Sequence, residues 1–106
     1  MKTRDEAMAL LQEYTKSESL LKHAYSVEAA MRWYAKHYGK SEEEIEKWGI
    51  TGLLHDFDYE MYPEPVSPDG HPFKGNAIMK ELGYPEDVLT AIMGHAEYTN
   101  TMRDLF

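Results

Sequence analysis

Apolar residues recur every three or four positions over most of this chain, which is the spacing of amphipathic helices. The first stripe follows a capping box formed by Thr3 and Glu6, and it contains Ala7, Leu10, Leu11 and Tyr14. The pattern therefore predicts a short helix that begins at Thr3. A polar break over residues 15–19 ends this helix, and its serines can cap a second one.

The second helix is predicted over residues 18–38, because Gly39 suits the position just after a helix. Its apolar face is expected to contain Leu20, His23, Val27, Ala30 and Tyr34. His23 would then lie among apolar neighbours, where an imidazole is either a hydrogen-bonded core residue or a ligand. His37 lies fourteen residues further on, about 21 Å away at 1.5 Å per residue, so the two cannot share one metal ion.

A third helix is predicted from a second capping box, which begins at Ser41. It runs through an apolar stretch that ends in the adjacent pair His55 and Asp56. Ionisable side chains at the end of a buried segment are costly unless they emerge into solvent, pair or bind a metal. Gly49 and Gly52 weaken this helix, but they would let another helix approach it closely.

Residues 62–72 are predicted to form a loop, since four prolines in ten residues exclude a helix. The loop starts close to the adjacent His-Asp pair and carries His71. Long irregular loops in compact domains are often functional.

Two further helices are predicted after this loop. The fourth covers residues 73–82 and is closed by Gly83, with Phe73, Ala77, Ile78 and Leu82 facing inward. The fifth begins at Pro85 and runs to His95, with an apolar stripe of Val88, Leu89 and Ile92.

These elements predict a single all-α domain over residues 1–106, a compact bundle of about five helices. The chain is 42% hydrophobic and has no cysteine, so it can bury a core but forms neither a disulfide nor a thiolate metal site; this composition fits the cytoplasm. No apolar run approaches the ~20 residues of a membrane helix. The net charge of −8, without a cluster of lysine or arginine, argues against duplex nucleic acid as a partner.

Four histidines lie at helix ends, on apolar faces or in the proline-rich loop: His23, His55, His71 and His95. Together with Asp56, they suit an imidazole–carboxylate site for one or two divalent ions, such as Fe, Mn, Zn, Ni or Mg. An ion of this kind lowers the pKa of a water molecule bound to it. Each histidine alone also has a structural explanation, so a purely structural helical domain with core histidines is a competing interpretation.

The order of these residues resembles the HD superfamily of metal-dependent phosphohydrolases, an all-helical group named for its adjacent His-Asp pair. LLKHAYSVEAAM is similar to its first histidine helix, and GLLHDFDYE to its HD motif. GHPFKGNAIM and IMGHAEYT resemble the further histidine segments of members that hold two metals. The resemblance implies that His23, His55 and Asp56 bind a first ion. It also implies that Asp56 bridges to a second ion, which His71 and His95 would hold.

The activity that this resemblance implies is hydrolysis of a small phosphorylated molecule, such as a nucleotide or another phosphoester. One of the acids just after the pair, Asp58 or Glu60, would act as general acid or base, and Asp58 is the catalytic candidate. The competing interpretation is that both are solvent-facing acids of a loop.

The C-terminal end departs from the superfamily pattern. Members usually supply one more aspartate after the last histidine, whereas Asp104 is the only late aspartate here and TNTMRDLF does not match that motif. Either a C-terminal part is missing, or the site is incomplete. An incomplete site favours the alternative function, a non-catalytic module that binds a metal or another ligand. The apolar end at Phe106 also predicts self-association.

Overall fold

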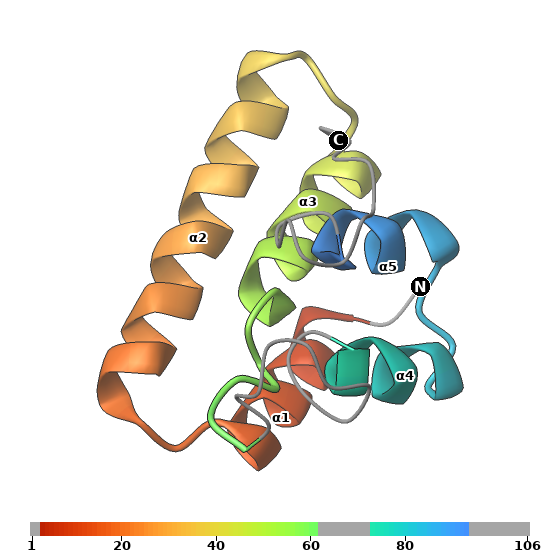
Figure 1. The fold of residues 1–106 in the computed structure, drawn as a ribbon. Helices are drawn as coiled ribbons and strands as arrows, with labels where there is room; N and C mark the ends of the chain where they lie inside the picture. The colour runs from red at the N-terminus through yellow and green to blue at the C-terminus, as the bar shows by residue number, and fades with distance from the viewer. Residues whose placement is uncertain (1–2, 62–72, 94–106) are drawn as a thin grey trace.

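The computed structural model describes residues 3–61 and 73–93, which form five α-helices and no β-strand. The helices are α1 (Arg4–Tyr14), α2 (Glu18–His37), α3 (Glu42–Leu54), α4 (Phe73–Glu81) and α5 (Glu86–Met93). The predicted all-α class is therefore confirmed. The central helix is α3, which contacts α1, α2 and α5, while α4 packs against α5 (Figure 1). None of the described helices has both the length and the apolar character that crossing a bilayer requires.

Local hydrogen bonds fix the helix ends where the sequence predicts them. The Glu6 N–H donates to Thr3 Oγ1 at 3.2 Å, and the Thr3 N–H donates to the Glu6 carboxylate at 3.0 Å, which completes the capping box of α1. Ser17 and Ser41 are the N-caps of α2 and α3, and the side chain of each accepts a hydrogen bond from an N–H group in the first turn of its helix. Gly39 follows α2 with a φ of +71°, a left-handed backbone conformation that glycine adopts without strain.

The second half of α3 is buried without interruption over residues 48–54. Its two glycines allow the close approach of α2 that the sequence predicts. A Cβ added to Gly52 would lie 2.9 Å from the carbonyl oxygen of Val27, and one added to Gly49 would overlap the Arg32 guanidinium. Because α2 lies directly against α3, the middle of α2 is held close to the C-terminal end of α3, which the adjacent His-Asp pair follows.

The prediction for the inward face of α2 is wrong at His23, Ala30 and Tyr34, whereas Leu20 and Val27 are partly buried. The buried residues are Ala24, Glu28 and Ala35, whereas Ala30 is exposed and the Tyr34 side chain is 49% exposed. The glycines of α3 make room for the side chains of Met31 and Arg32 and for the backbone at Val27, so this contact sets which face of α2 is turned inward. His23 is exposed and is not part of the apolar core.

The prediction for the inward face of α4 is wrong at Ala77 and Leu82, whereas Phe73 is partly buried and Ile78 packs against the main core. Gly75 and Met79 are buried, whereas Ala77 is exposed and Leu82 is 44% exposed. A Cβ added to Gly75 would lie 2.7 Å from Asp58 Cγ, so the missing side chain lets α4 lie against the turn that follows α3. A tertiary contact, and not the apolar period, sets the orientation of this helix.

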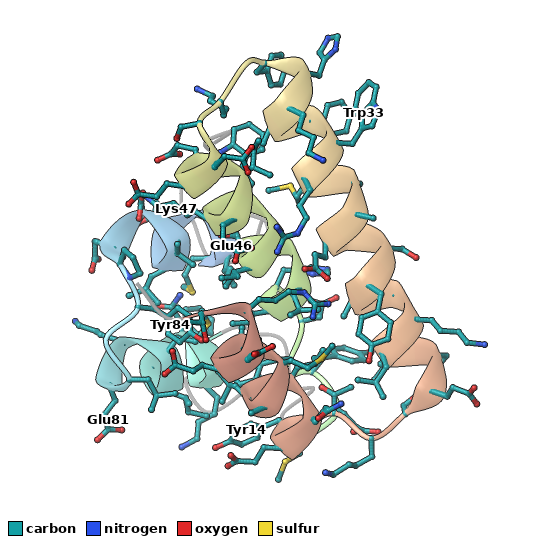
Figure 2. The ribbon with its side chains drawn as sticks, turned by 180° about the vertical axis from the view of Figure 1, so that it is seen from behind. Tyr14, Trp33, Glu46, Lys47, Glu81 and Tyr84 are labelled. Carbon is teal, nitrogen blue, oxygen red and sulfur yellow. The ribbon has the colours of Figure 1, made fainter. Side chains whose placement is uncertain are left out.

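An ion-pair network that the sequence does not predict joins the first three helices. Arg4 donates two hydrogen bonds to the buried Glu28 carboxylate, at 2.7 and 2.9 Å, and Arg32 donates two more, at 3.0 and 3.1 Å. Burial raises the pKa of Glu28, but the hydrogen bonds from the two arginines outweigh this effect and hold the pKa below its ordinary value of 4.5. Arg32 also pairs at 2.6 Å with Glu46 of α3, which is labelled in Figure 2.

Candidate metal centre

The adjacent His-Asp pair follows directly on the last turn of α3, and His55 is the C-cap residue. The Nδ1 atom of His55 lies 2.7 Å from the carbonyl oxygen of Gly52. Because a carbonyl can only accept, Nδ1 carries the proton, and in the neutral ring the lone pair lies on Nε2. A backbone hydrogen bond of this kind fixes both the tautomer and the orientation of a metal-binding histidine.

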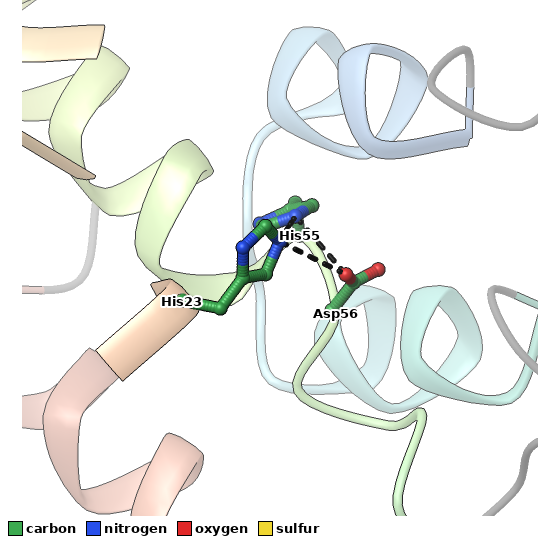
Figure 3. A group of neighbouring side chains, drawn as sticks. All are labelled: His23, His55 and Asp56. Atoms are coloured by element: carbon green, nitrogen blue, oxygen red, sulfur yellow. Dashed lines mark hydrogen bonds and ion pairs between the residues drawn. The ribbon is translucent and has the colours of Figure 1, made fainter. Parts of the chain in front are cut away.

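His23 projects from the second turn of α2 towards this pair, as Figure 3 shows. Its Nε2 lies 3.2 Å from His55 Nε2 and 3.6 Å from Asp56 Oδ2. His55 Nε2 lies 3.1 Å from the same carboxylate oxygen. Two imidazole nitrogens and one carboxylate oxygen therefore converge on one point, although α2 and α3 bring them from separate parts of the chain.

The separations within this His–His–Asp group (His23, His55 and Asp56) suit one bound cation. Its three ligand atoms all lie within 4.8 Å of one another. Ligand atoms held about 2.1 Å from one ion lie about 3 Å apart, close to the separations observed. Imidazole nitrogen combined with carboxylate oxygen is a donor set for Zn, Fe, Mn and Ni, and the carboxylate also suits Mg. The described residues thus fit a divalent metal.

The group lies at the molecular surface with one side open. The side chains of His55 and Asp56 are 15% and 27% exposed, and that of His23 is 51% exposed. The next residue, Phe57, is 2% exposed and belongs to the main apolar core. The pair is therefore anchored beside the packed core, while the His23 side chain is about half exposed. The interpretation of His23 as a core histidine is wrong.

Asp58 lies behind this group in the interior. It is 2% exposed, and its Oδ2 accepts a hydrogen bond of 2.8 Å from the Gly75 N–H at the start of α4. The interpretation of Asp58 as a solvent-facing loop acid is therefore wrong. Its predicted role in proton transfer stays a prediction, and in the structure its carboxylate binds the first turn of α4.

Glu60 is exposed, but its carboxylate is also engaged by the backbone. It accepts hydrogen bonds from the N–H groups of Lys16 and Ser17, between α1 and α2. The role of Glu60 as an alternative general acid or base stays a prediction, and its contact with the α1–α2 connection is one that nothing in the sequence indicates, because the partners lie more than forty residues apart. The Gly52 carbonyl was also missed, although a histidine at a helix C-terminus signals that an earlier carbonyl is within reach.

The predicted ligands His71 and His95 lie outside the described residues, as does Asp104. The structure therefore brings together three of the five predicted ligands: His23, His55 and Asp56. The predictions for a second ion, for its ligands and for a further aspartate all concern parts of the chain that the structure does not describe.

The family model of the HD domain matches residues 20–105, which is most of the chain. The matched span contains all three residues of the His–His–Asp group. Comparisons with curated proteins and with solved structures gave no match.

Proposed function

Since this chain belongs to the HD domain family, we propose that it is a metal-dependent phosphohydrolase acting on a small phosphorylated molecule, such as a nucleotide or another phosphoester. The observation that carries this proposal is the convergence of His23, His55 and Asp56 at separations of 3.1 to 3.6 Å. The His55–Gly52 hydrogen bond supports it, because it leaves Nε2 as the acceptor that faces the other two groups.

In this proposal, Nε2 of His23, Nε2 of His55 and the Asp56 carboxylate hold a divalent cation. The ion supplies Lewis acidity, which polarises a phosphoryl group and lowers the pKa of water. Two neutral imidazoles and one carboxylate leave part of the charge of a divalent ion uncompensated. This local positive charge offsets the net charge of −8, which would otherwise repel a phosphate.

The remaining residues of the site position these three ligands. The carbonyl oxygen of Gly52 holds the His55 ring in one orientation, and the packed core behind Phe57 prevents the pair from turning inward. The partly exposed His23 side is the open approach for substrate. A second ion, bridged by Asp56 and held by His71 and His95, belongs to the same proposal.

The test is hydrolysis of a panel of nucleotides and simple phosphoesters in the presence of Mn²⁺, Fe²⁺, Zn²⁺, Ni²⁺ or Mg²⁺. We expect the parent to hydrolyse at least one compound, and His55→Ala to lose at least about a hundredfold in rate. His37→Ala is the matched control, because it removes an exposed histidine from the far end of α2. Equal loss in both variants, or equal activity in the parent and His55→Ala, would refute the proposal.

A second candidate function is a non-catalytic HD module that binds a metal or another ligand. The same His–His–Asp group supports it, because three side chains can bind an ion without turnover of a substrate. This candidate predicts that the parent binds a divalent ion through the same three side chains and hydrolyses no compound of the panel. Metal-dependent turnover that His55→Ala abolishes would exclude it.

A further inference from the structure

Hydrogen bonds join two short segments of the chain, residues 15–17 and residues 57–60, which lie close in sequence to the ligands of the His–His–Asp group. Thr15, which is 2% exposed, donates from its hydroxyl to the Phe57 carbonyl oxygen at 2.9 Å. The N–H groups of Lys16 and Ser17 donate to the two oxygens of the Glu60 carboxylate, at 2.5 and 2.9 Å. We call these three hydrogen bonds the loop clamp. It joins the α1–α2 connection to the turn that follows α3.

In both segments that it joins, the loop clamp lies a few residues from a ligand of the His–His–Asp group. Ser17 is the N-cap of α2, and His23 follows it within the first two turns of that helix. On the other side, Glu60 follows Asp56 by four residues. Residues 17–23 and residues 56–60 therefore connect the clamp to the point where His23 Nε2 lies 3.6 Å from Asp56 Oδ2. A displacement at the clamp would also displace His23 relative to Asp56, because the helical segment that ends at His23 is stiff.

A second contact also holds α2, and it is the competing explanation for the position of His23. Gly52 of α3 lies against Val27 and Met31, so the middle of α2 is fixed by packing. That contact holds α2 at a point beyond His23, whereas the clamp holds the start of the helix before His23. Leu21 and Ala24 pack against the main core on either side of His23, so packing also holds the second turn of α2, whereas the clamp holds the N–H groups at the helix start.

A carboxylate suits the clamp better than other side chains. It offers one oxygen to each of two consecutive N–H groups, and an ionised acceptor makes the stronger kind of hydrogen bond. Its negative charge also lies at the N-terminal end of α2, where the helix dipole favours an anion. A glutamine at this position has only one acceptor oxygen and no charge, so it can serve only one of the two N–H groups well.

From this geometry we infer that Glu60 is a positioning residue, which holds His23 opposite His55 and Asp56 through the loop clamp. Its effect on metal affinity rests on the proposed function, whereas its effect on the distance between the two histidines does not. Coupling between two binding events is reciprocal. Occupation of the His–His–Asp group by a divalent ion must therefore strengthen the clamp by the same factor by which the clamp strengthens binding.

The experiment compares the parent with Glu60→Ala, Glu60→Gln and the matched control Glu6→Ala. Glu6 also accepts a backbone N–H near a helix start, but it does so at the beginning of α1. In metal-free protein, the readout is the nuclear Overhauser contact between the His23 and His55 rings, whose centroids lie 5.1 Å apart. The second readout is the dissociation constant of Co²⁺, with its visible absorption spectrum as a report on ligand geometry.

We expect Glu60→Ala to weaken the contact between the two rings and to raise the Co²⁺ dissociation constant by about tenfold with an altered spectrum. Glu60→Gln should fall between the parent and Glu60→Ala, and Glu6→Ala should match the parent. In the parent, Co²⁺ should slow amide exchange at Lys16 and Ser17, which packing of α2 alone does not predict. If Glu60→Ala does not fold, the Glu60→Gln result decides.

An unchanged ring contact and an unchanged Co²⁺ constant in the folded Glu60 variants would overturn the inference. Amide exchange rates at Lys16 and Ser17 that do not change when Co²⁺ binds would also overturn it. If the parent itself binds no Co²⁺ but the Glu60 variants lose the ring contact, the proposed function fails and the positioning role of Glu60 stands.

Discussion

The Nε2 atoms of His23 and His55 lie 3.2 Å apart, although 32 residues separate them in the sequence. Two structural features support this distance. The glycines of α3 let α2 pack closely against it, and the hydrogen bond to Gly52 sets which nitrogen of His55 faces His23. The site is therefore a product of helix packing as much as of its own side chains.

Gly52→Ala should weaken both the fold and the site. The added Cβ would lie 2.9 Å from the Val27 carbonyl oxygen, which belongs to backbone and cannot move without shifting α2. We expect a loss of about 1–3 kcal/mol in the free energy of unfolding, measured with urea, and weaker metal binding because His23 moves with its helix. Gly39→Ala is the control: its φ of +71° makes alanine strained, at about 1 kcal/mol, but open space surrounds it. Unchanged metal affinity in Gly52→Ala would contradict the role given to this contact.

Asp58 and Gly75 should behave as a coupled pair. Asp58→Ala removes the acceptor of the buried Gly75 N–H, at a cost of about 1–3 kcal/mol. Gly75→Ala forces a Cβ to within 2.7 Å of Asp58 Cγ, so it should destabilise the parent as well. The double variant removes the clash with the carboxylate and keeps only the 2.9 Å approach of the two Cβ atoms, so we expect it to be more stable than the sum of the single effects by about 1 kcal/mol. Strict additivity in urea unfolding would show that the two residues act separately.

The buried carboxyl group of Glu28 should make the free energy of unfolding decrease at acidic pH. Because the folded state lowers the pKa of this carboxyl, its ionised form stabilises the fold above the ordinary value of 4.5, and that contribution is lost as the pH falls through the lower folded pKa. Glu28→Gln should therefore cost about 2 kcal/mol near neutral pH, and the difference from the parent should shrink below pH 4.5.

Urea unfolding of the parent and Glu28→Gln at pH 7 and pH 3.5 measures this difference. Glu18→Gln is the control, since the Glu18 side chain is 86% exposed and lies 3.8 Å from Lys22, a pair that contributes little. A cost of Glu28→Gln that is the same at both pH values would contradict the ionised pairing with Arg4 and Arg32.

The helix ends were predictable because their signals are local. Thr3, Ser41 and Gly39 act within one turn of the chain, and the structure places each of them as the sequence predicts. The faces of α2 and α4 were only partly predictable from their apolar periods. Glu28 is buried because two arginines from different helices reach it, and Gly75 is buried because Asp58 occupies the space beside it.

The candidate metal centre was likewise predictable only in part. A resemblance in the order of residues pointed to His23, His55 and Asp56, and the structure brings these three together. The contacts that orient them were not visible in the sequence. They depend on a backbone carbonyl at Gly52 and on the carboxylate of Glu60 reaching residues of a distant loop.

The most direct test of this account is the metal content of the protein purified without chelator, compared with His55→Ala and His37→Ala. The account predicts about one or two equivalents of a divalent metal in the parent and in His37→Ala, and a loss of at least one equivalent in His55→Ala. No metal in the parent, even after incubation with Mn²⁺ and Fe²⁺, would contradict it. So would a content that His55→Ala leaves unchanged.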